Sequence, residues 1–216
     1  MKKKSKITLC VSLCLLAAFG AWTALISFVN VKEIGPHCSA VGFSTINGAF
    51  HKLTGVNMLL YTITDWLGLI PIAFAFGFAV LGLIQWIKRK NILKVDFSIL
   101  ILGCFYIITI AAYLLFETMV INYRPVLSNG FLEASYPSST TLLVLCVMPT
   151  AIMQLNTRIK NKILKSLVYA LLIAFIIFMV VGRLISGVHW LTDIIGGLLL
   201  SAGLVLLYYS IVSLKQ

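Results

Sequence analysis

The sequence predicts an all-α protein that crosses a membrane with six helices. Of its 216 residues, 61% are hydrophobic and only 11% are charged, whereas a soluble domain is typically about 45–50% apolar and about 25% charged. The hydrophobic residues also fall into blocks of about 20, which is the length that crosses a hydrocarbon core. We therefore expect a polytopic membrane bundle rather than a water-soluble fold.

The six spans are expected at residues of about 7 to 30, 66 to 87, 97 to 116, 139 to 155, 163 to 181 and 190 to 212. The first follows a cluster of lysines and stays apolar to Val31, which is longer than the core of a signal peptide, so we interpret it as an uncleaved anchor. The fourth is the shortest and has the least certain ends. No internal repeat is apparent, and one membrane domain over residues 1–216 is expected.

A long segment, residues 32 to 65, separates the first two spans. From Phe43 to Ile63 its apolar side chains recur at steps of three, four or seven residues, which is typical of one or two helices lying in the membrane interface. Such helices could form a lid or a surface through which lipid reaches a site. An inert interfacial connector explains the pattern equally well.

The net charge of +11 predicts an orientation in the membrane. Thirteen of the 17 lysines and arginines lie in segments that an even number of crossings places on one side of the bundle. These are Lys2, Lys3, Lys4, Lys6, Lys88, Arg89, Lys90, Lys94, Arg158, Lys160, Lys162, Lys165 and Lys215. Basic loops mark the cytoplasmic side, so we expect cytoplasmic N- and C-termini, a multi-pass plasma membrane protein and no nucleic-acid partner.

The five cysteines do not indicate a disulfide framework. Cys38 stands alone outside the spans, and a lone thiol cannot form an internal bridge there. The other four, Cys10, Cys14, Cys104 and Cys146, fall within spans. We interpret those four as buried packing residues.

A histidine and an aspartate lie four residues apart where the last outer loop enters the sixth span. His189 and Asp193 would share one helical face, so the carboxylate could accept a hydrogen bond from one ring nitrogen. That bond would make the other nitrogen a nucleophile or a general base. A polar pair that only joins helices is the alternative, but an ionisable pair near a membrane span is by default functional.

Groups suited to binding phosphate surround this pair in the outer loops. Arg183 precedes His189 by six residues, and Arg124 stands before Pro125. Both offer planar donors to phosphate oxygens. Residues 136–141, Tyr-Pro-Ser-Ser-Thr-Thr, begin the fourth span, where free N–H groups and the helix dipole favour an anion. Alone, that stretch would indicate only a helix cap.

Taken together, these elements resemble the type 2 phosphatidic acid phosphatase and vanadium-dependent haloperoxidase superfamily. Its third motif, Ser-Arg-x5-His-x3-Asp, is matched by Arg183, His189 and Asp193, with Gly182 in place of serine. The motifs cover about residues 117 to 197. The resemblance extends to the six-span layout with an outward-facing site.

Two other motifs of this superfamily are changed in the chain. Its first motif, Lys-x6-Arg-Pro, keeps Arg124 and Pro125 but has Glu117 in place of lysine. A glutamate would repel phosphate, so we assign Glu117 no binding role. Its second motif, Pro-Ser-Gly-His, reads Pro-Ser-Ser-Thr at residues 137–140. Thr140 cannot supply a proton as histidine does.

The resemblance implies a two-step mechanism without a metal or other cofactor. His189 would attack phosphorus to give a phosphohistidine, Asp193 would orient the ring, and water would then release phosphate. The phosphoryl oxygens would be held by Arg124, Ser138, Ser139, Thr140 and Arg183. His37 and His51 are isolated in the sequence and are not expected to bind a metal.

The expected function is hydrolysis of lipid phosphates or diphosphates at the outer face of the membrane, on undecaprenyl diphosphate or phosphatidate-type lipids. An alkoxide leaving group needs a proton, whereas a phosphate monoester, whose last pKa is about 6, does not. The missing histidine at Thr140 therefore favours a diphosphate. The alternatives are a lipid phosphotransferase and, given Glu117 and Thr140, a catalytically silent protein that binds lipid phosphates.

Overall fold

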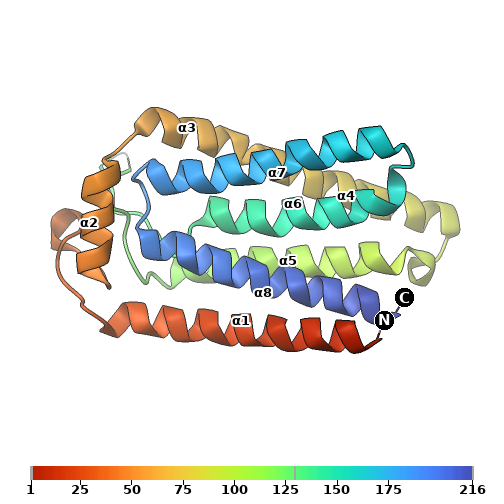
Figure 1. The fold of residues 1–216 in the computed structure, drawn as a ribbon, viewed down its shortest axis with the longest axis horizontal. Helices are drawn as coiled ribbons and strands as arrows, with labels where there is room; N and C mark the ends of the chain where they lie inside the picture. The colour runs from red at the N-terminus through yellow and green to blue at the C-terminus, as the bar shows by residue number, and fades with distance from the viewer. Residues whose placement is uncertain (1, 129, 216) are drawn as a thin grey trace.

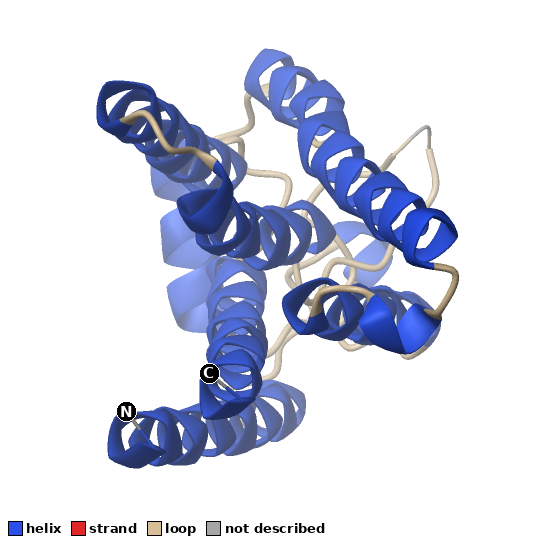
Figure 2. Cartoon of the chain, turned by 90° about the vertical axis from the view of Figure 1, so that its right-hand side faces the viewer, coloured by secondary structure: helices blue, strands red, loops and turns tan. Residues whose placement is uncertain are grey.

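A computed structural model describes residues 2–128 and 130–215 of the chain. Within these residues, six helices are long and apolar enough to cross a membrane, and they run side by side as one bundle (Figure 1). Figure 2 looks along the bundle from the end at which both termini lie. The predicted all-α membrane bundle is confirmed.

The helices follow the predicted order along the chain. They are α1 (Lys2–Phe28), α2 (Ser44–Thr54), α3 (Met58–Leu67), α4 (Leu69–Arg89), α5 (Phe97–Thr118), α6 (Ser139–Arg158), α7 (Lys162–Ile185) and α8 (Leu191–Lys215), with short 3-10 turns η1 (Pro36–Cys38) and η2 (Ile92–Lys94). The fourth span, expected to be short, is a helix of 20 residues. Both termini lie at one end of the bundle, and α2 lies at the other (Figure 1).

The segment between the first two spans divides into two helices with different orientations. As expected of an interfacial helix, α2 lies across the end of the bundle (Figure 1). In contrast, α3 continues into α4 through Gly68, and the two form an apolar stretch of 32 residues. Asn57 begins α3 by accepting a hydrogen bond from the Leu60 amide at 2.9 Å. The expectation of one or two interfacial helices thus fits α2, whereas α3 packs along α7 and leads directly into the second span.

Small residues fasten α1 along α8. The Ser12 hydroxyl donates to the Gly203 carbonyl at 2.8 Å, and a Cβ atom on Gly203 would lie only 2.7 Å from Leu16. At the end of the bundle that holds both termini, the hydroxyls of Ser5 and Ser210 each donate a hydrogen bond to the backbone carbonyl of the other residue. Close approach at glycine and serine is typical of helix pairs in membranes, so α1 is held as an integral part of the bundle.

A buried tyrosine fixes the chain just before α6. The Tyr136 ring stacks on Phe19 with centroids 6.2 Å apart, and its hydroxyl lies 2.7 Å from the Thr23 hydroxyl. The same ring covers Gly196, where an added Cβ would lie 2.4 Å from it. Tyr136 therefore locks residues 135–138 between α1 and α8, beside the start of α8.

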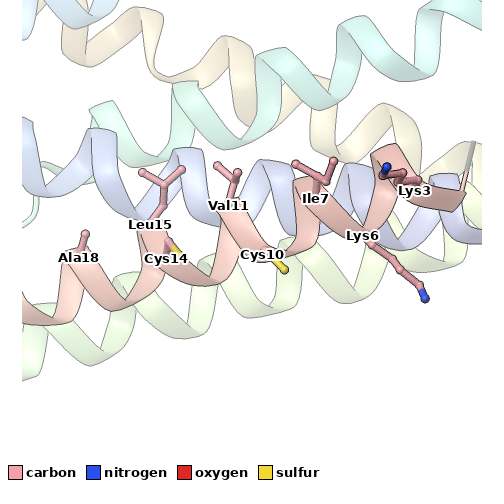
Figure 3. Close-up of a pocket in the computed structure, with 8 residues that line it drawn as sticks. All are labelled: Lys3, Lys6, Ile7, Cys10, Val11, Cys14, Leu15 and Ala18. Atoms are coloured by element: carbon pink, nitrogen blue, oxygen red, sulfur yellow. The ribbon is translucent and has the colours of Figure 1, made fainter.

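The cysteines are less buried than expected. All five are free thiols, and Cys146 is the one that is buried. Cys10, Cys14 and Cys104 are exposed on the sides of their helices, and the first two line an apolar groove on α1 beside Val11 (Figure 3). The packing interpretation is wrong for these three, because their side chains lie on the outer surface of the bundle rather than in its core.

Candidate active site

The turn between α7 and α8 places His189 at the end of the bundle that carries α2. Gly187 in this turn has a φ of +70°, and a Cβ atom there would lie 1.8 Å from the Gly55 carbonyl oxygen. The Asn57 amide also donates to the Ser186 carbonyl at 2.9 Å. The connection between α2 and α3 therefore holds the turn that presents the histidine.

The start of α8 is capped by polar side chains. Asp193 accepts a hydrogen bond from the Trp190 amide at 2.8 Å, which satisfies a donor that the first helical turn would leave unpaired. Asn47 of α2 accepts from the Thr192 amide at 3.2 Å and donates to the Thr192 hydroxyl at 3.0 Å. Asn47 is fully buried, so α2 is fastened over the site rather than loosely attached.

The hydrogen bonds of His189 define which ring nitrogen can react. Its Nδ1 lies 3.1 Å from the Ser135 carbonyl oxygen. A carbonyl only accepts hydrogen bonds, so Nδ1 carries the proton and Nε2 keeps its lone pair. Nδ1 is 3.7 Å from the Asp193 carboxylate, which is longer than the direct hydrogen bond that we expected. The Ser135 hydroxyl instead lies 3.2 Å from Nδ1 and donates to Asp193.

Burial sets the charge of the His189 imidazole. His189 is 3% exposed and Asp193 is 0% exposed. Burial lowers the pKa of His189 below its ordinary value, and the nearby Asp193 carboxylate offsets only part of that effect. The imidazole is therefore neutral near pH 7. Its Nε2 is buried and has no hydrogen-bond partner among residues 2–128 and 130–215.

The two predicted arginines meet at one aromatic ring. Arg183, from the end of α7, is 1% exposed and lies with its guanidinium carbon 4.7 Å from the centre of the Tyr61 ring. Arg124, from the loop before α6, donates to the Tyr61 hydroxyl at 3.0 Å. Each arginine also has a carboxylate partner, Asp65 at 3.2 Å from Arg183 and Glu133 at 3.3 Å from Arg124.

The start of α6 brings the predicted hydroxyl groups to the same end of the bundle. Ser138 is fully buried, its amide donates to the Asp193 carbonyl at 3.1 Å, and its hydroxyl accepts from Thr141 at 3.0 Å. Ser139 lines a crevice together with His189. Thr140 faces the junction of α3 and α4, since its methyl group would lie 3.7 Å from a Cβ on Gly68.

The crevice at His189 also contains the residue that replaces the motif lysine. Glu117, at the end of α5, lines it with Ser135 and Ser139. The crevice has a volume of about 10 Å³, which is room for about one water molecule. A phosphate group can therefore reach His189 by this route only when side chains around the crevice move apart.

A comparison with known proteins identifies the family. The family model described as the PAP2 superfamily matches residues 70–216, which are 147 of the 216 residues. The chain belongs to the PAP2 superfamily. It is also similar to a solved transmembrane PAP2-type phosphatidylglycerolphosphate phosphatase from Bacillus subtilis, with a TM-score of 0.52 and 19% identity, covering 92% of this chain and 93% of that one. No curated protein sequence matches the chain.

The PAP2 match extends from α4 to α8 and contains every residue that we predicted for the site. These residues are Arg124, Ser138, Ser139, Thr140, Arg183, His189 and Asp193. The resemblance inferred from the motifs is thus confirmed at the level of the family. The first three helices precede the matched region, yet α2 and α3 both contact the PAP2 residues of the site.

Four residues at the site were missed in the sequence. Ser135 and Asn122 both approach the Asp193 carboxylate, the second at 3.5 Å. Tyr61 and Asp65 of α3 contact the arginines. A signal existed for Asp65, which is an acidic residue at the edge of an apolar span. The other three have no local signal, since their partners are distant in the sequence.

In the described part of the chain, no three His, Cys, Asp or Glu side chains come close enough to hold an ion; that His37 and His51 bind no metal stays a prediction. His51 nevertheless lies near the PAP2 residues. Its ring centre is 5.5 Å from that of Trp190, and burial lowers its pKa. His51 therefore packs beside the residue that follows His189 in the chain.

Proposed function

We propose that this PAP2 protein hydrolyses lipid phosphates or lipid diphosphates at the membrane surface through a phosphohistidine intermediate. One observation carries the proposal. His189 Nε2 and Arg183 Nε are both buried and lack a partner among the described residues, although buried polar atoms are nearly always hydrogen-bonded. A phosphoryl group would satisfy both, because its phosphorus accepts a lone pair and its oxygens accept hydrogen bonds.

In the first step, the lone pair of His189 Nε2 forms a bond to phosphorus. The bond from phosphorus to the leaving oxygen breaks, and that oxygen keeps the electron pair. Arg124, Arg183 and the amides at the start of α6 stabilise the charge on the phosphoryl oxygens. Asp193 acts through the Ser135 hydroxyl to hold the proton on Nδ1 and to balance the positive charge of the phosphorylated ring.

In the second step, water attacks the phosphorus of the phosphohistidine. The water gives up one proton to the surrounding solvent as its oxygen bonds to phosphorus, and the electrons of the N–P bond return to Nε2. The products are inorganic phosphate and a neutral imidazole, which is the protonation state that burial favours for His189. An acceptor hydroxyl in place of water would give a lipid phosphotransferase by the same steps.

The residue at position 140 supports a diphosphate as the preferred substrate. Thr140 has no titratable proton, and a phosphate leaving group needs one far less than an alkoxide does. An undecaprenyl diphosphate-type lipid meets this condition better than phosphatidate. One observation favours a second candidate, a catalytically silent lipid-phosphate binder, since Glu117 lines the crevice at His189 and would keep a phosphate held by the arginines away from the nucleophile.

A phosphate-release panel tests the proposal. The purified protein is assayed with phosphatidate, phosphatidylglycerophosphate and undecaprenyl diphosphate, and the His189→Ala variant serves as the blank. We expect release above the blank, fastest from the diphosphate. Phosphate that moves to an added acceptor lipid would indicate a transferase. Vanadate binding without release from any substrate would leave the silent binder as the function.

A further inference from the structure

Tyr61 of α3 joins the two arginines of the proposed phosphate site. Its ring centre lies 4.7 Å from the Arg183 guanidinium carbon and 5.8 Å from that of Arg124. Its hydroxyl accepts from Arg124 at 3.0 Å. Two guanidinium groups repel each other, and an aromatic face between them offsets part of that repulsion. Tyr61 therefore holds both cations on one side of the bundle.

Asp65 follows Tyr61 by four residues, so both side chains project from the same face of α3. Its carboxylate lies 3.2 Å from a terminal nitrogen of Arg183. The two partners differ sharply in exposure, because the Asp65 side chain is 56% exposed and that of Arg183 is 1% exposed. A buried guanidinium requires an anion beside it, whereas an exposed carboxylate can return to water at little cost.

Gly182 allows α3 to approach Arg183 this closely. A Cβ atom on Gly182 would lie 2.8 Å from the Thr64 methyl group and 3.6 Å from Leu60. Serine at this position, as in the superfamily's third motif, would push α3 away from α7. Glycine in place of the motif serine therefore gives α3 the room that it needs for Asp65 to contact Arg183.

We infer that Asp65 is a built-in counter-anion that competes with the phosphoryl group for Arg183, and that Tyr61 positions the two arginines for that exchange. The inference rests on the proposed function, because it requires Arg183 to bind phosphate. A phosphoryl oxygen displaces the Asp65 carboxylate on binding. Asp65 returns as inorganic phosphate leaves, so the buried arginine is paired at both stages and product release is favoured.

The test compares Asp65→Asn with the native protein in detergent micelles. Inhibition by inorganic phosphate and by orthovanadate is measured against lipid hydrolysis, and orthovanadate binding is measured separately by thermal shift. We expect the variant to bind both anions about five- to tenfold more tightly, since a charged competitor for Arg183 is lost. Asp65→Glu, which keeps the charge, should return the affinities towards the native values.

Glu33→Gln is the matched control. Glu33 is exposed in the segment between α1 and α2 and has no ion pair among the described residues. Its replacement removes the same charge from the same end of the bundle. We expect less than about a twofold change in anion affinity, because exposed charges at a distance are screened by salt. An equal gain in anion affinity in both variants would show that only the net charge matters, and it would overturn the role of Asp65.

The result that overturns the inference is unchanged or weaker anion binding in Asp65→Asn. A merely structural Asp65 would give that result, with a lower melting temperature. If the asparagine variant does not fold, Asp65→Ser is judged by the same criterion. Failure of the proposed function is distinguishable, because a native protein that hydrolyses no lipid phosphate can still be tested for orthovanadate binding by thermal shift.

Tyr61 is tested by two substitutions that separate its ring from its hydroxyl. Tyr61→Phe keeps the ring beside Arg183 and loses the bond to Arg124, whereas Tyr61→Leu loses both. We expect KM to rise about threefold in the first variant and about tenfold in the second, with a smaller change in kcat. Equal KM values in all three proteins would show that Tyr61 does not position the arginines.

Discussion

At the residue scale, the Ser135 hydroxyl lies between His189 and Asp193 and connects the two side chains by hydrogen bonds. It lies 3.2 Å from Nδ1 and donates to the carboxylate. The four-residue spacing correctly predicted that the two side chains lie close together, but not on one helical face, because His189 lies in the turn before α8. It could not predict the bridge, because Ser135 is 54 residues away from His189 and such contacts leave no pattern in a local stretch of sequence.

The Ser135 bridge predicts that substitutions of the three connected residues reduce activity to different degrees. His189→Ala should abolish hydrolysis, since no neighbour can replace the nucleophile. Asp193→Asn should leave a small residual activity, and Ser135→Ala should reduce kcat by roughly 10–100-fold, because each keeps the ring but disturbs its orientation. Rates of purified variants on one lipid diphosphate provide the measurement. Native kcat in Ser135→Ala would show that Asp193 acts on the ring without the serine.

The pKa of His189 predicts the acid limb of the pH profile. Only the neutral imidazole has a lone pair on Nε2, and burial lowers the pKa of this group below its ordinary value of about 6.5. Activity should therefore be complete above that value and fall as pH decreases through the lower pKa of the folded protein. The measurement is kcat/KM against pH, with a lipid diphosphate whose own pKa values are known as the substrate. An acid limb centred above pH 7 would contradict a buried, neutral histidine.

Thr140 predicts the discrimination between substrate classes. A positioned general acid contributes about 10²–10⁴-fold, so its absence costs most when the leaving group is basic. The native protein should favour diphosphates over monoesters, and Thr140→His should raise monoester hydrolysis more than diphosphate hydrolysis. His51→Ala tests whether the histidine beside Trp190 already donates the proton. Equal native rates for both classes, unchanged in either variant, would show that leaving-group protonation does not limit the reaction.

At the scale of elements, the site depends on two helices that lie outside the region matched by the family. Hydrophobic periodicity correctly predicted helices between the first two spans. It did not predict that α3 continues into α4, because the pattern gives the apolar face of a helix and not its tilt. That tilt comes from packing on α7, where Gly182 leaves room for Thr64.

The contact between the α2–α3 connection and the catalytic turn predicts an effect on stability. Gly187→Ala should lower the free energy of unfolding by about 2–3 kcal/mol, because its φ is +70° and the added Cβ would lie 1.8 Å from the Gly55 carbonyl oxygen. Gly55→Ala is the matched control, with a φ of +62° but nothing within 4 Å of its Cβ. It should cost less, about 1–2 kcal/mol, because only backbone strain opposes the substitution. Equal melting temperatures for the two variants would show that backbone strain, and not the contact, dominates.

At the scale of the whole molecule, the site and the basic loops lie at opposite ends of the bundle. The turn between α4 and α5 and the turn between α6 and α7 share an end with both termini, whereas α2 lies at the other end (Figure 1). The even number of spans could be predicted from the sequence, because hydrophobic blocks of membrane length are a strong signal. Which end of the bundle faces the cytoplasm is predicted only by the positive-inside rule.

Thiol labelling tests that orientation. In a cysteine-free background, single cysteines at Lys52 and Ser128 should react with an impermeant thiol reagent on intact cells, because Lys52 is exposed and Ser128 is partly exposed at the end of the bundle that carries the site. A cysteine at Lys160, exposed between α6 and α7, should react only after the cells are opened. Lys160 is preferable to Asn161, whose side chain caps α7. Ser186 is unsuitable because it is fully buried.

The labelling pattern decides where the substrate must come from. Reaction at Lys52 and Ser128 alone would place Arg124, Arg183 and His189 on the outer side, where a lipid diphosphate carried across the membrane would present its head group. The reverse pattern, with Lys160 labelled on intact cells, would invert the orientation and require a cytoplasmic substrate. The chemistry proposed for His189 would survive that result, because it depends on hydrogen bonds within the bundle and not on the side of the membrane that they face.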